Sequence, residues 1–565
     1  MAASIMEKSR TLLSRILFLA VLACSLGASF GASAQDKKPS ATDIAPVREY
    51  IAKGWDTLTR SMTDCAFVAD PKLKVHPVLY LPAGMAVPPA VEKLHAACNV
   101  EIEHLAKPIQ QLGDIDTSTI QPHGLLYLPN KYVVPGGRFN EMYGWDSYFI
   151  VVGLLRDGRI DLARGMVENF FFEIENYGAL LNANRTYYLT RSQPPFLSSM
   201  VLGVYEAEKA AGHDDIDWLK RAYPLLVKDY SMWTRAPHLA GTTELARYYD
   251  FGDGPPAEGA QDEGGYYRDV VTYFMLHPDQ ADHYLVEQKK GEAAEGQGAS
   301  YSIKACDVAT TMSRAECGAE HVVRLSTDYY KGDRSMRESG FDISFRFGAY
   351  GSGTHHFAPV CLNSLLYKAE KDIERISVLI GKPDDAKVWK MRAEARRSRI
   401  QKYLWDVEHG FFVDYDFTSG TKSNYRYLTT YYPLWAGLAT PEQAAAVEQN
   451  LSTFEHPGGL AMSNENVGTQ WDLPYGWAPV QLLAIEGLRR YGFNGDADRL
   501  SEKFLATVVA NFQQDGTIRE KYNVVTSSSE AQVTAGYQMN VIGFGWTNAA
   551  FLELLHDLQK EAVKP

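Results

Sequence analysis

Helical periodicity recurs along most of this chain, and it limits the fold more than any other feature of the sequence. In eight segments, apolar residues return every three or four positions, as they do on the buried face of an amphipathic helix. Alternating strand patterns are scarce, and the short apolar run at 410–414 reads as part of a loop. The sequence therefore predicts a mostly helical protein. The predicted helices span 161–176, 195–210, 218–233, 362–380, 386–404, 442–451, 480–491 and 497–512.

Boundary signals support a single long domain. Thr440 offers an N-cap, Pro441 a first-turn proline and Gln443 the third position of a capping box. After about residue 40, no linker rich in Pro, Gly or Ser divides the chain, and no fixed repeat is visible. A length of 565 residues would allow several domains. We nevertheless expect one all-helical domain over 35–565.

Residues 1–34 have the pattern of a secretory signal peptide. Three basic residues begin the segment, an apolar run spans 16–26, and Ala32-Ser33-Ala34 supplies a small-residue cleavage site. A retained membrane anchor and a lipoprotein acceptor at Cys24 are the alternatives. No later run of eighteen apolar residues follows. We expect an exported protein, periplasmic or secreted, with no membrane span in the mature chain.

Composition and charge exclude some classes of partner. Hydrophobic residues make up 45% of the chain and charged residues 22%, as in a folded soluble protein. The net charge is -13, and no run of Lys and Arg follows the leader. This charge argues against nucleic acid as a partner. Aromatic residues reach 12%, which fits carbohydrate binding without establishing it.

Five cysteines remain after the predicted leader, and an odd number leaves at least one thiol free. Cys361 adjoins the helix predicted at 362–380 and is expected to be a buried free thiol. Cys306 and Cys317 flank a polar loop and are expected to form a disulfide, and Cys65 and Cys98 are a second possible pair. The sequence contains no CxxC and no HExxH. We therefore expect no metal and no cofactor.

The segment 135–148, PGGRFNEMYGWDSY, holds an unusual mixture of charged, amide and aromatic side chains. Such a mixture suits a sugar pocket, where hydroxyl groups take hydrogen bonds and the face of the sugar ring stacks on aromatic rings. A buried polar network that ties a loop to the core is the alternative. Similar stretches lie between the predicted helices, as active-site loops do on a rigid scaffold. They span 182–195, 337–342, 470–479, 519–523 and 543–548.

These segments resemble the motifs of the trehalases, members of glycoside hydrolase family 37 that cleave α,α-trehalose into two glucose molecules. PGGRFNEMYGWDSY and QWDLPYGWAP resemble the two signature segments, and LNANRTYYLTRSQPPF, ESGFD and REKYN resemble further ones in the same order. The wording is most similar to that of neutral-type trehalases. The likeness covers about 132–548. It implies an all-α fold of the (α/α)6 barrel (toroid) type, which agrees with the helical periodicity.

The resemblance also implies an inverting reaction carried out by two carboxyl groups. In such an enzyme one carboxylic acid protonates the leaving oxygen, and one carboxylate activates water on the opposite face of the sugar. By motif, Asp342 matches the general acid and Glu520 the general base. Without the motifs, Asp342 would read as a turn cap, and Glu520 as a solvated charge between Arg519 and Lys521.

Further positions match residues that bind glucose in the family. Arg and Asp side chains suit this role because charge-assisted hydrogen bonds fix neighbouring hydroxyl groups. Trp471, Trp477 and Trp546 are expected to wall the pocket, with plain core packing as the alternative. The matched positions are Arg138, Trp145, Asp146, Asn182, Arg191, Ser192, Gln193, Glu258 and Gly340.

Two positions depart from the family pattern. An Arg-Pro-Glu triplet is replaced by Pro256-Ala257-Glu258, so one substrate arginine is lost, and Tyr537 stands where a glutamate is usual. Both changes bear on the second sugar site. The sequence predicts an exported, monomeric, inverting trehalase whose partner is trehalose. The alternatives are a hydrolase of a related α-glucoside such as glucosylglycerate, and an inactive sugar-binding relative. Retention of both Asp342 and Glu520 argues against the inactive relative.

Overall fold

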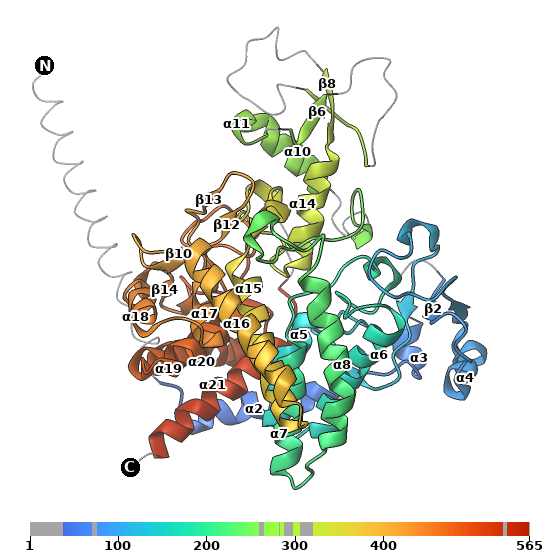
Figure 1. Cartoon of the computed structure of the whole chain (residues 1–565), viewed down its shortest axis with the longest axis horizontal. Helices are drawn as coiled ribbons and strands as arrows, with labels where there is room; N and C mark the ends of the chain where they lie inside the picture. Colours follow the sequence, from blue (N-terminus) through green and yellow to red (C-terminus); the bar gives the residue numbers. More distant parts are fainter. Residues whose placement is uncertain are drawn as a thin grey trace, which may run out of the picture.

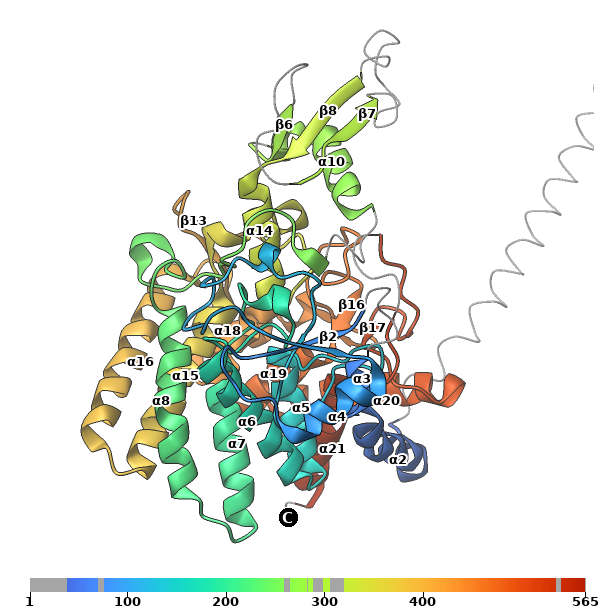
Figure 2. The ribbon, with the colours of Figure 1, turned by 90° about the vertical axis from the view of Figure 1, so that its right-hand side faces the viewer.

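The computed structural model describes residues 38–69, 76–258, 265–281, 283–287, 298–304, 320–534 and 540–563. Several predictions concern residues outside these ranges. They are the signal peptide at 1–34, the disulfide between Cys306 and Cys317, and the substitution at Tyr537. Most of the described chain folds into two concentric layers of helices, and a smaller lobe projects from one end (Figures 1 and 2).

Among the described helices, six form a closed inner ring in which each contacts the next. Ten of the thirteen residues of α5 (Gly144–Arg156) are buried, and so are all five residues of α17 (Tyr432–Ala436). A helix that is covered on all sides must be apolar around most of its circumference, as these are. The ring consists of α5 (Gly144–Arg156), α7 (Leu197–Ala210), α15 (Val360–Leu379), α17 (Tyr432–Ala436), α19 (Ala478–Arg490) and α21 (Gly545–Val563).

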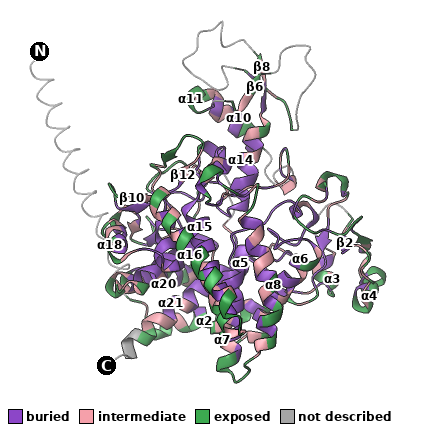
Figure 3. Ribbon diagram, viewed as in Figure 1, coloured by how far each residue is buried: buried purple, intermediate pink, exposed green. Residues whose placement is uncertain are grey.

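A second set of helices alternates with the inner ones along the chain. In α16 only Ala386, Trp389, Ala393, Arg396 and Ile400 are buried, a stripe that repeats every three or four residues. The rest of that helix faces solvent (Figure 3). The strict alternation of inner and outer helices confirms the predicted (α/α)6 toroid. The outer set comprises α2 (Ala41–Leu58), α6 (Ile160–Asn176), α8 (Ile216–Trp233), α16 (Pro383–Tyr403), α18 (Pro441–Gln449) and α20 (Asn494–Asp515).

All eight predicted helices are present, with ends that differ by a few residues. The capping box at Thr440 and Gln443 is confirmed, since each side chain bonds the backbone of the other. Of the twelve described barrel helices, α2, α5, α17 and α21 were not predicted. Because α5 and α17 are buried on almost every side, they lack the polar face that makes helical periodicity visible.

Strands in the described chain are short, as expected, but three of them form a parallel sheet that was not predicted. Its order is β3-β2-β4, with β2 (Val78–Leu81) between β3 (Glu101–His104) and β4 (Leu125–Leu126). All four residues of β2 are buried, so the strand has no alternating pattern to recognise. The run at 410–414 contributes β11 (Phe411–Phe412) to a hairpin with β10 (Trp405–Asp406).

The structure decides two predictions about cysteine. A disulfide joins Cys65 to Cys98 and so ties α3 (Cys65–Val68) to α4 (Pro89–Cys98), next to the parallel sheet. Cys361 is a buried free thiol, as predicted. Burial raises the pKa of this thiol, although Arg346 opposes the rise. Among the described residues, no helix is both long enough and apolar enough to cross a bilayer.

The lobe comprises the described residues between 265 and 338. The antiparallel sheet β6-β8-β7 lies beside α10 (Tyr266–Leu276) and α11 (Pro278–Ala281). These elements share a small hydrophobic cluster of their own, rich in tyrosine. The last element, α14 (Thr327–Glu338), runs from the lobe toward the barrel (Figure 1). A single domain over 35–565 stays a prediction. The strands are β6 (Leu285–Glu287), β7 (Tyr301–Lys304) and β8 (Glu320–Leu325).

Candidate active site

One cavity at the barrel brings together residues from seven separate stretches of the chain. Nine of the eleven predicted site residues line it, although they span almost four hundred positions of sequence. The remaining two, Arg138 and Ser192, do not line it. The nine are Trp145, Asp146, Asn182, Arg191, Gln193, Glu258, Gly340, Asp342 and Glu520.

The first turn of α5 supplies Trp145 and Asp146. The cap residue gives this turn no side-chain hydrogen bond, and a distant loop replaces it. Gln193 accepts a hydrogen bond from the Trp145 backbone N–H at 2.9 Å. The Asn182 carbonyl accepts another from the Gly144 N–H at 3.0 Å. Gln193 therefore positions the start of α5 as well as lining the cavity.

Asp146 is a buried carboxyl group among other carboxyl groups. Burial raises its pKa well above the usual value, and the negative charges of Glu520 and Asp342 raise it further. The three carboxyl groups are therefore close enough to interact electrostatically. Because like charges in a buried site disfavour simultaneous ionisation, such a site can hold one carboxyl protonated beside an ionised one.

The two predicted residues outside the cavity lining have other contacts. The Ser192 hydroxyl donates to the Leu180 carbonyl oxygen at 2.7 Å, which fixes the loop between Asn182 and Gln193. The Arg138 guanidinium lies 4.5 Å from the centre of the Phe139 ring, and Phe139 is itself a lining residue. Arg138 and Ser192 therefore contact residues next to or in the cavity wall and do not line the cavity themselves.

A network of buried charges also lines the cavity. Arg191 pairs with Glu258 and lies 3.6 Å from Asp250, and its Nε donates to the Asn182 side chain at 2.7 Å. Burial would raise the pKa of Glu258, but Arg191 and Arg337 outweigh it and hold this pKa below its usual value. Glu258 is thus an anion held by two arginines at the cavity wall.

Asp342 follows the end of α14, in a turn that requires glycine. Gly340 has φ +76°, and a Cβ there would lie 2.8 Å from Cε2 of Trp145. The next residue, Phe341, packs edge-on against Trp145 and Trp471. The Asp342 carbonyl accepts a hydrogen bond from Gln470 Nε2 at 2.5 Å. These contacts fix the backbone that carries the Asp342 carboxyl group.

Glu520 comes directly before β17 (Lys521–Asn523), which pairs with β16 (Tyr475–Trp477). Lys521 Nζ lies 3.0 Å from Glu520 Oε2 and 3.2 Å from Gln470 Oε1. The Lys521 side chain is fully buried. Glu520 is therefore not a solvated charge but one member of a buried ion pair. Gln470 joins the two halves of the site, because it also holds Asp342.

Tryptophans form one wall of the cavity, as predicted. Trp471 and Trp477 stack with their ring centres 3.8 Å apart, and Trp145 and Trp546 meet this pair at steeper angles. Trp546 also donates its Nε1 hydrogen to the Glu520 carbonyl at 3.1 Å. Aromatic rings and charged groups that line one cavity are the combination expected of a sugar site.

Sequence reasoning missed several lining residues. Arg337 immediately precedes the ESGFD segment and is almost completely buried, but it reads as an ordinary charge on a polar helix. The signal that could have identified Arg337 was its position beside a motif. The missed aromatic residues could have been identified only from the mixed polar and aromatic composition of their loops. The missed residues are Pro135, Phe139, Tyr143, Tyr188, Arg337, Gln470 and Phe544.

Comparison with known proteins assigns a family to this chain. A model of the family described as "Trehalase" matches residues 85–316 and 323–559. A probable trehalase from Eremothecium gossypii is 37% identical, over 88% of this chain and 70% of the relative. Two proteins described as cytosolic neutral trehalases, from Saccharomyces cerevisiae and Neurospora crassa, are 36% and 35% identical. The alignments with these two span 63% and 69% of their own lengths.

A solved structure has the same architecture. The neutral trehalase Nth1 from Saccharomyces cerevisiae matches with a TM-score of 0.71 and 32% identity, over 93% of this chain and 96% of that one. The likeness to neutral-type proteins is confirmed. The predicted export is contradicted, because the curated relatives are described as cytosolic. The local pattern at 1–34 was thus a misleading guide to location.

Proposed function

The chain belongs to the trehalase family, and we propose that its cavity hydrolyses α,α-trehalose to two glucose molecules with inversion at the cleaved bond. The observation that carries this proposal is the convergence of Asp342 and Glu520 on one cavity together with the matched sugar-binding side chains. If the protein had lost its catalytic role, packing alone would not require both carboxyl groups and the sugar-binding side chains to remain at one cavity.

In the proposed mechanism, Asp342 is the general acid. It protonates the oxygen that links the two sugars as the bond breaks, so that one glucose leaves as a neutral alcohol. Burial and the charges of Glu520 and Asp342 raise the pKa of Asp146, so the carboxyl groups of this site interact with one another. The turn at Gly340 lies against Trp145, which fixes the backbone that leads to Asp342.

Glu520 is the proposed general base. It takes a proton from a water molecule that attacks the opposite face of the sugar, which inverts the configuration at that carbon. The ion pair with the buried Lys521 holds the Glu520 carboxyl group in position for this step. The two carboxyl groups are then expected to lie roughly 6.5–9.5 Å apart in a sugar complex, with the water between them.

The remaining groups bind the sugars. Arg191, Glu258 and Asn182 already form one hydrogen-bonded set, and sugar hydroxyl groups can join it without leaving a buried charge unpaired. Trp471 offers an aromatic face to the ring carbons. Arg138 and Ser192 support the site in the proposal through Phe139 and the 182–193 loop.

Hydrolysis of a related α-glucoside such as glucosylglycerate is the competing activity, because Pro256-Ala257-Glu258 lacks the arginine of the family triplet. A panel of α-glucosides tested with purified protein separates the two. We expect kcat/KM to be greatest for trehalose. A larger value for glucosylglycerate would assign the second sugar site to glycerate instead.

The decisive experiment is an NMR time course of trehalose hydrolysis. An inverting enzyme releases one β-glucose and one α-glucose for each bond cleaved, before mutarotation brings the two anomers to their equilibrium ratio. We expect both anomers in equal amounts during early turnover. Release of the α anomer alone would mean retention, and would contradict the roles given to Asp342 and Glu520. Absence of glucose release would leave the inactive sugar-binding relative as the better description.

A further inference from the structure

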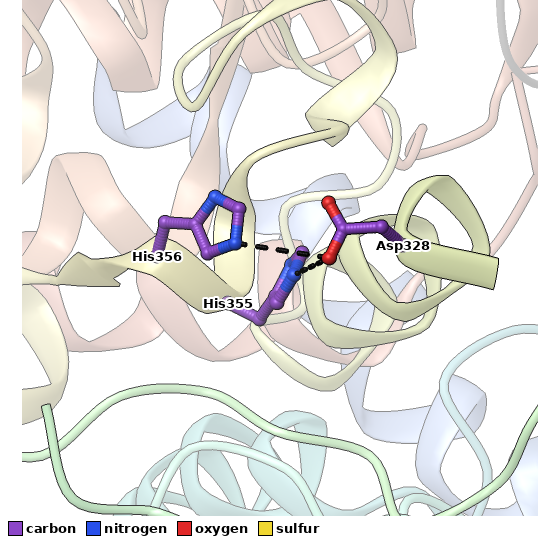
Figure 4. Close-up of side chains that lie close together, drawn as sticks. All are labelled: Asp328, His355 and His356. Carbon is purple, nitrogen blue, oxygen red and sulfur yellow. Dashed lines mark hydrogen bonds and ion pairs between the residues drawn. The ribbon is translucent and has the colours of Figure 1, made fainter. Parts of the chain in front are cut away.

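A second cluster of polar side chains lies away from the sugar cavity, where the lobe meets the barrel (Figure 4). Asp328 stands in the first turn of α14, and His355 and His356 end the short helix η5 (Thr354–His356). One ligand atom from each of these three residues lies within 4.8 Å of the other two. None of them lines the sugar cavity.

The side chains point at a common centre. His355 Nε2 lies 2.9 Å from Asp328 Oδ1, and His356 Nε2 lies 3.8 Å from the same oxygen. Figure 4 shows both rings directed at this carboxylate. The other carboxylate oxygen lies 2.7 Å from Nε2 of His283, which precedes β6 in the lobe. Three imidazoles therefore surround one carboxylate.

We propose that Asp328, His355 and His356 bind a divalent transition-metal ion of the zinc class, with His283 next to the remaining coordination position. Zinc is bound at about 2.0–2.2 Å by imidazole nitrogen and carboxylate oxygen. Ligand atoms around a tetrahedral ion at these distances are about 3.3–3.5 Å apart. The observed separations of 2.9 and 3.8 Å lie on either side of this value, so small side-chain rotations suffice.

The cluster is partly shielded from solvent. The side chain of His355 is 6% exposed, that of His356 26% and that of Asp328 34%. Imidazole nitrogen and carboxylate oxygen are both ligands that zinc accepts. To bind the ion through Nε2, the His355 ring must carry its proton on Nδ1.

Such an ion would brace the joint between the two parts of the molecule. Asp328 and Arg337 lie on the same helix, nine residues and about 13 Å apart along its axis. His355 and His356 end the segment that begins at Asp342. The ion would thus pin the segment after the proposed acid to the helix before it, without taking part in the reaction.

The test is Zn²⁺ binding to the tag-free full chain after exhaustive chelation. Competition titration with a chromophoric chelator should give one ion per chain, and neither Mg²⁺ nor Ca²⁺ should compete, because these ions prefer oxygen ligands. The variants Asp328→Asn and His356→Gln should each weaken binding at least about tenfold, since each removes one ligand. His321→Gln is the matched control, because His321 also pairs with a carboxylate in the lobe, at Glu287.

A second measurement separates loss of a ligand from loss of fold. With Zn²⁺ present, the melting temperature should rise for the wild type and for His321→Gln, but not for His356→Gln. X-ray absorption of the zinc complex should show only nitrogen and oxygen ligands. Equal Zn²⁺ affinity in the wild type, Asp328→Asn and His356→Gln, or no binding by a folded wild type, would overturn the proposal. The cluster would then be a histidine–aspartate hydrogen-bond network.

Glucose release should be retained after chelation, since no residue of the sugar cavity belongs to the cluster. This activity is measured independently of Zn²⁺ binding, so failure of the proposed hydrolysis would not affect the metal result. Activity that disappears with chelation and returns only with Zn²⁺ would contradict a purely structural ion.

Discussion

The barrel and the lobe each deliver one of the two proposed catalytic carboxyl groups, and they do so differently. Glu520 is held by the barrel, at the start of a strand paired with β16 and beside the fully buried Lys521. Asp342 follows α14, a helix whose other end belongs to the lobe. The barrel core is a single large hydrophobic cluster, whereas the lobe has a small one rich in tyrosine.

The barrel and the lobe thus position different carboxyl groups. The position of the base is fixed by strand register and by a buried ion pair, so it depends on the barrel alone. The position of the acid depends on a turn at Gly340 and on the helix that precedes it. Gln470 is a shared contact, since it accepts a hydrogen bond from Lys521 and donates one to the Asp342 carbonyl. Apart from this contact, substitutions near the base and substitutions near the acid should have separate effects on kcat.

The largest effect is expected when either carboxyl group is neutralised. Asp342→Asn and Glu520→Gln should each lower kcat by about 10³–10⁴-fold, because each removes one partner of the proton transfer. Circular dichroism and sugar affinity should stay near those of the wild type. If one of the two variants kept substantial activity, the substituted residue would not have the catalytic role assigned to it.

A smaller effect is expected at the barrel side alone. Lys521→Met should lower kcat by about 10²-fold, because the buried Glu520 carboxylate would lose the partner that holds it in place. The matched control is Arg519→Met on the other side of Glu520, since Arg519 pairs with the exposed Asp515. Equal losses in both variants would contradict a specific role for Lys521.

A still smaller effect is expected at the lobe side. Gly340→Ala should lower kcat by about 10-fold to 10²-fold, because the new methyl group meets Trp145 and displaces the Asp342 turn. Gly381→Ala isolates this contact: Gly381 has the same φ of +76°, but a Cβ there meets nothing within 4 Å. The control should lose some stability and keep its kcat. A similar fall in kcat for both variants would assign the effect to backbone strain instead.

The smallest effect on catalysis is expected in the outer layer of the barrel. Burial raises the pKa of Asp229 in α8 to about 7. The folded state therefore binds a proton that the unfolded state releases near pH 4, and stability should fall as pH rises from about 4 to about 7. Asp229→Asn should remove this fall and be more stable at pH 8, on the order of 2–4 kcal/mol. Asp217→Asn, on the exposed face of the same helix, is the control.

Thermal or denaturant unfolding at pH 4 and pH 8 measures this difference, and kcat for trehalose should be unchanged in both variants. A stability difference between the wild type and Asp229→Asn that is the same at pH 4 and at pH 8 would contradict the raised pKa of Asp229. Asp229 does not line the cavity. A change in kcat would therefore mean that the outer layer of helices influences the active site.

The sequence by itself determined the helical architecture and most of the cavity. Amphipathic helices such as α16 were visible because one face meets solvent and the other the core, so that their pattern is local. Nine of the residues predicted for the site line the cavity, and they were predicted because their motifs are long and specific. The same local reasoning failed at 1–34, where a leader-like pattern predicted an export that the cytosolic relatives contradict.

Only the tertiary structure decided which side chains meet. Arg519 and Lys521 were equivalent partners for Glu520 in the sequence, and strand pairing with β16 brought Lys521 to it. Gln193 became a cap for α5 across 48 positions of sequence, and Arg337 reached Glu258 from the end of a lobe helix. The cluster at Asp328 joins histidines that lie more than twenty residues away. These contacts arise from long-range packing, and the direction of a side chain across a packed interface is not encoded in its neighbours along the chain.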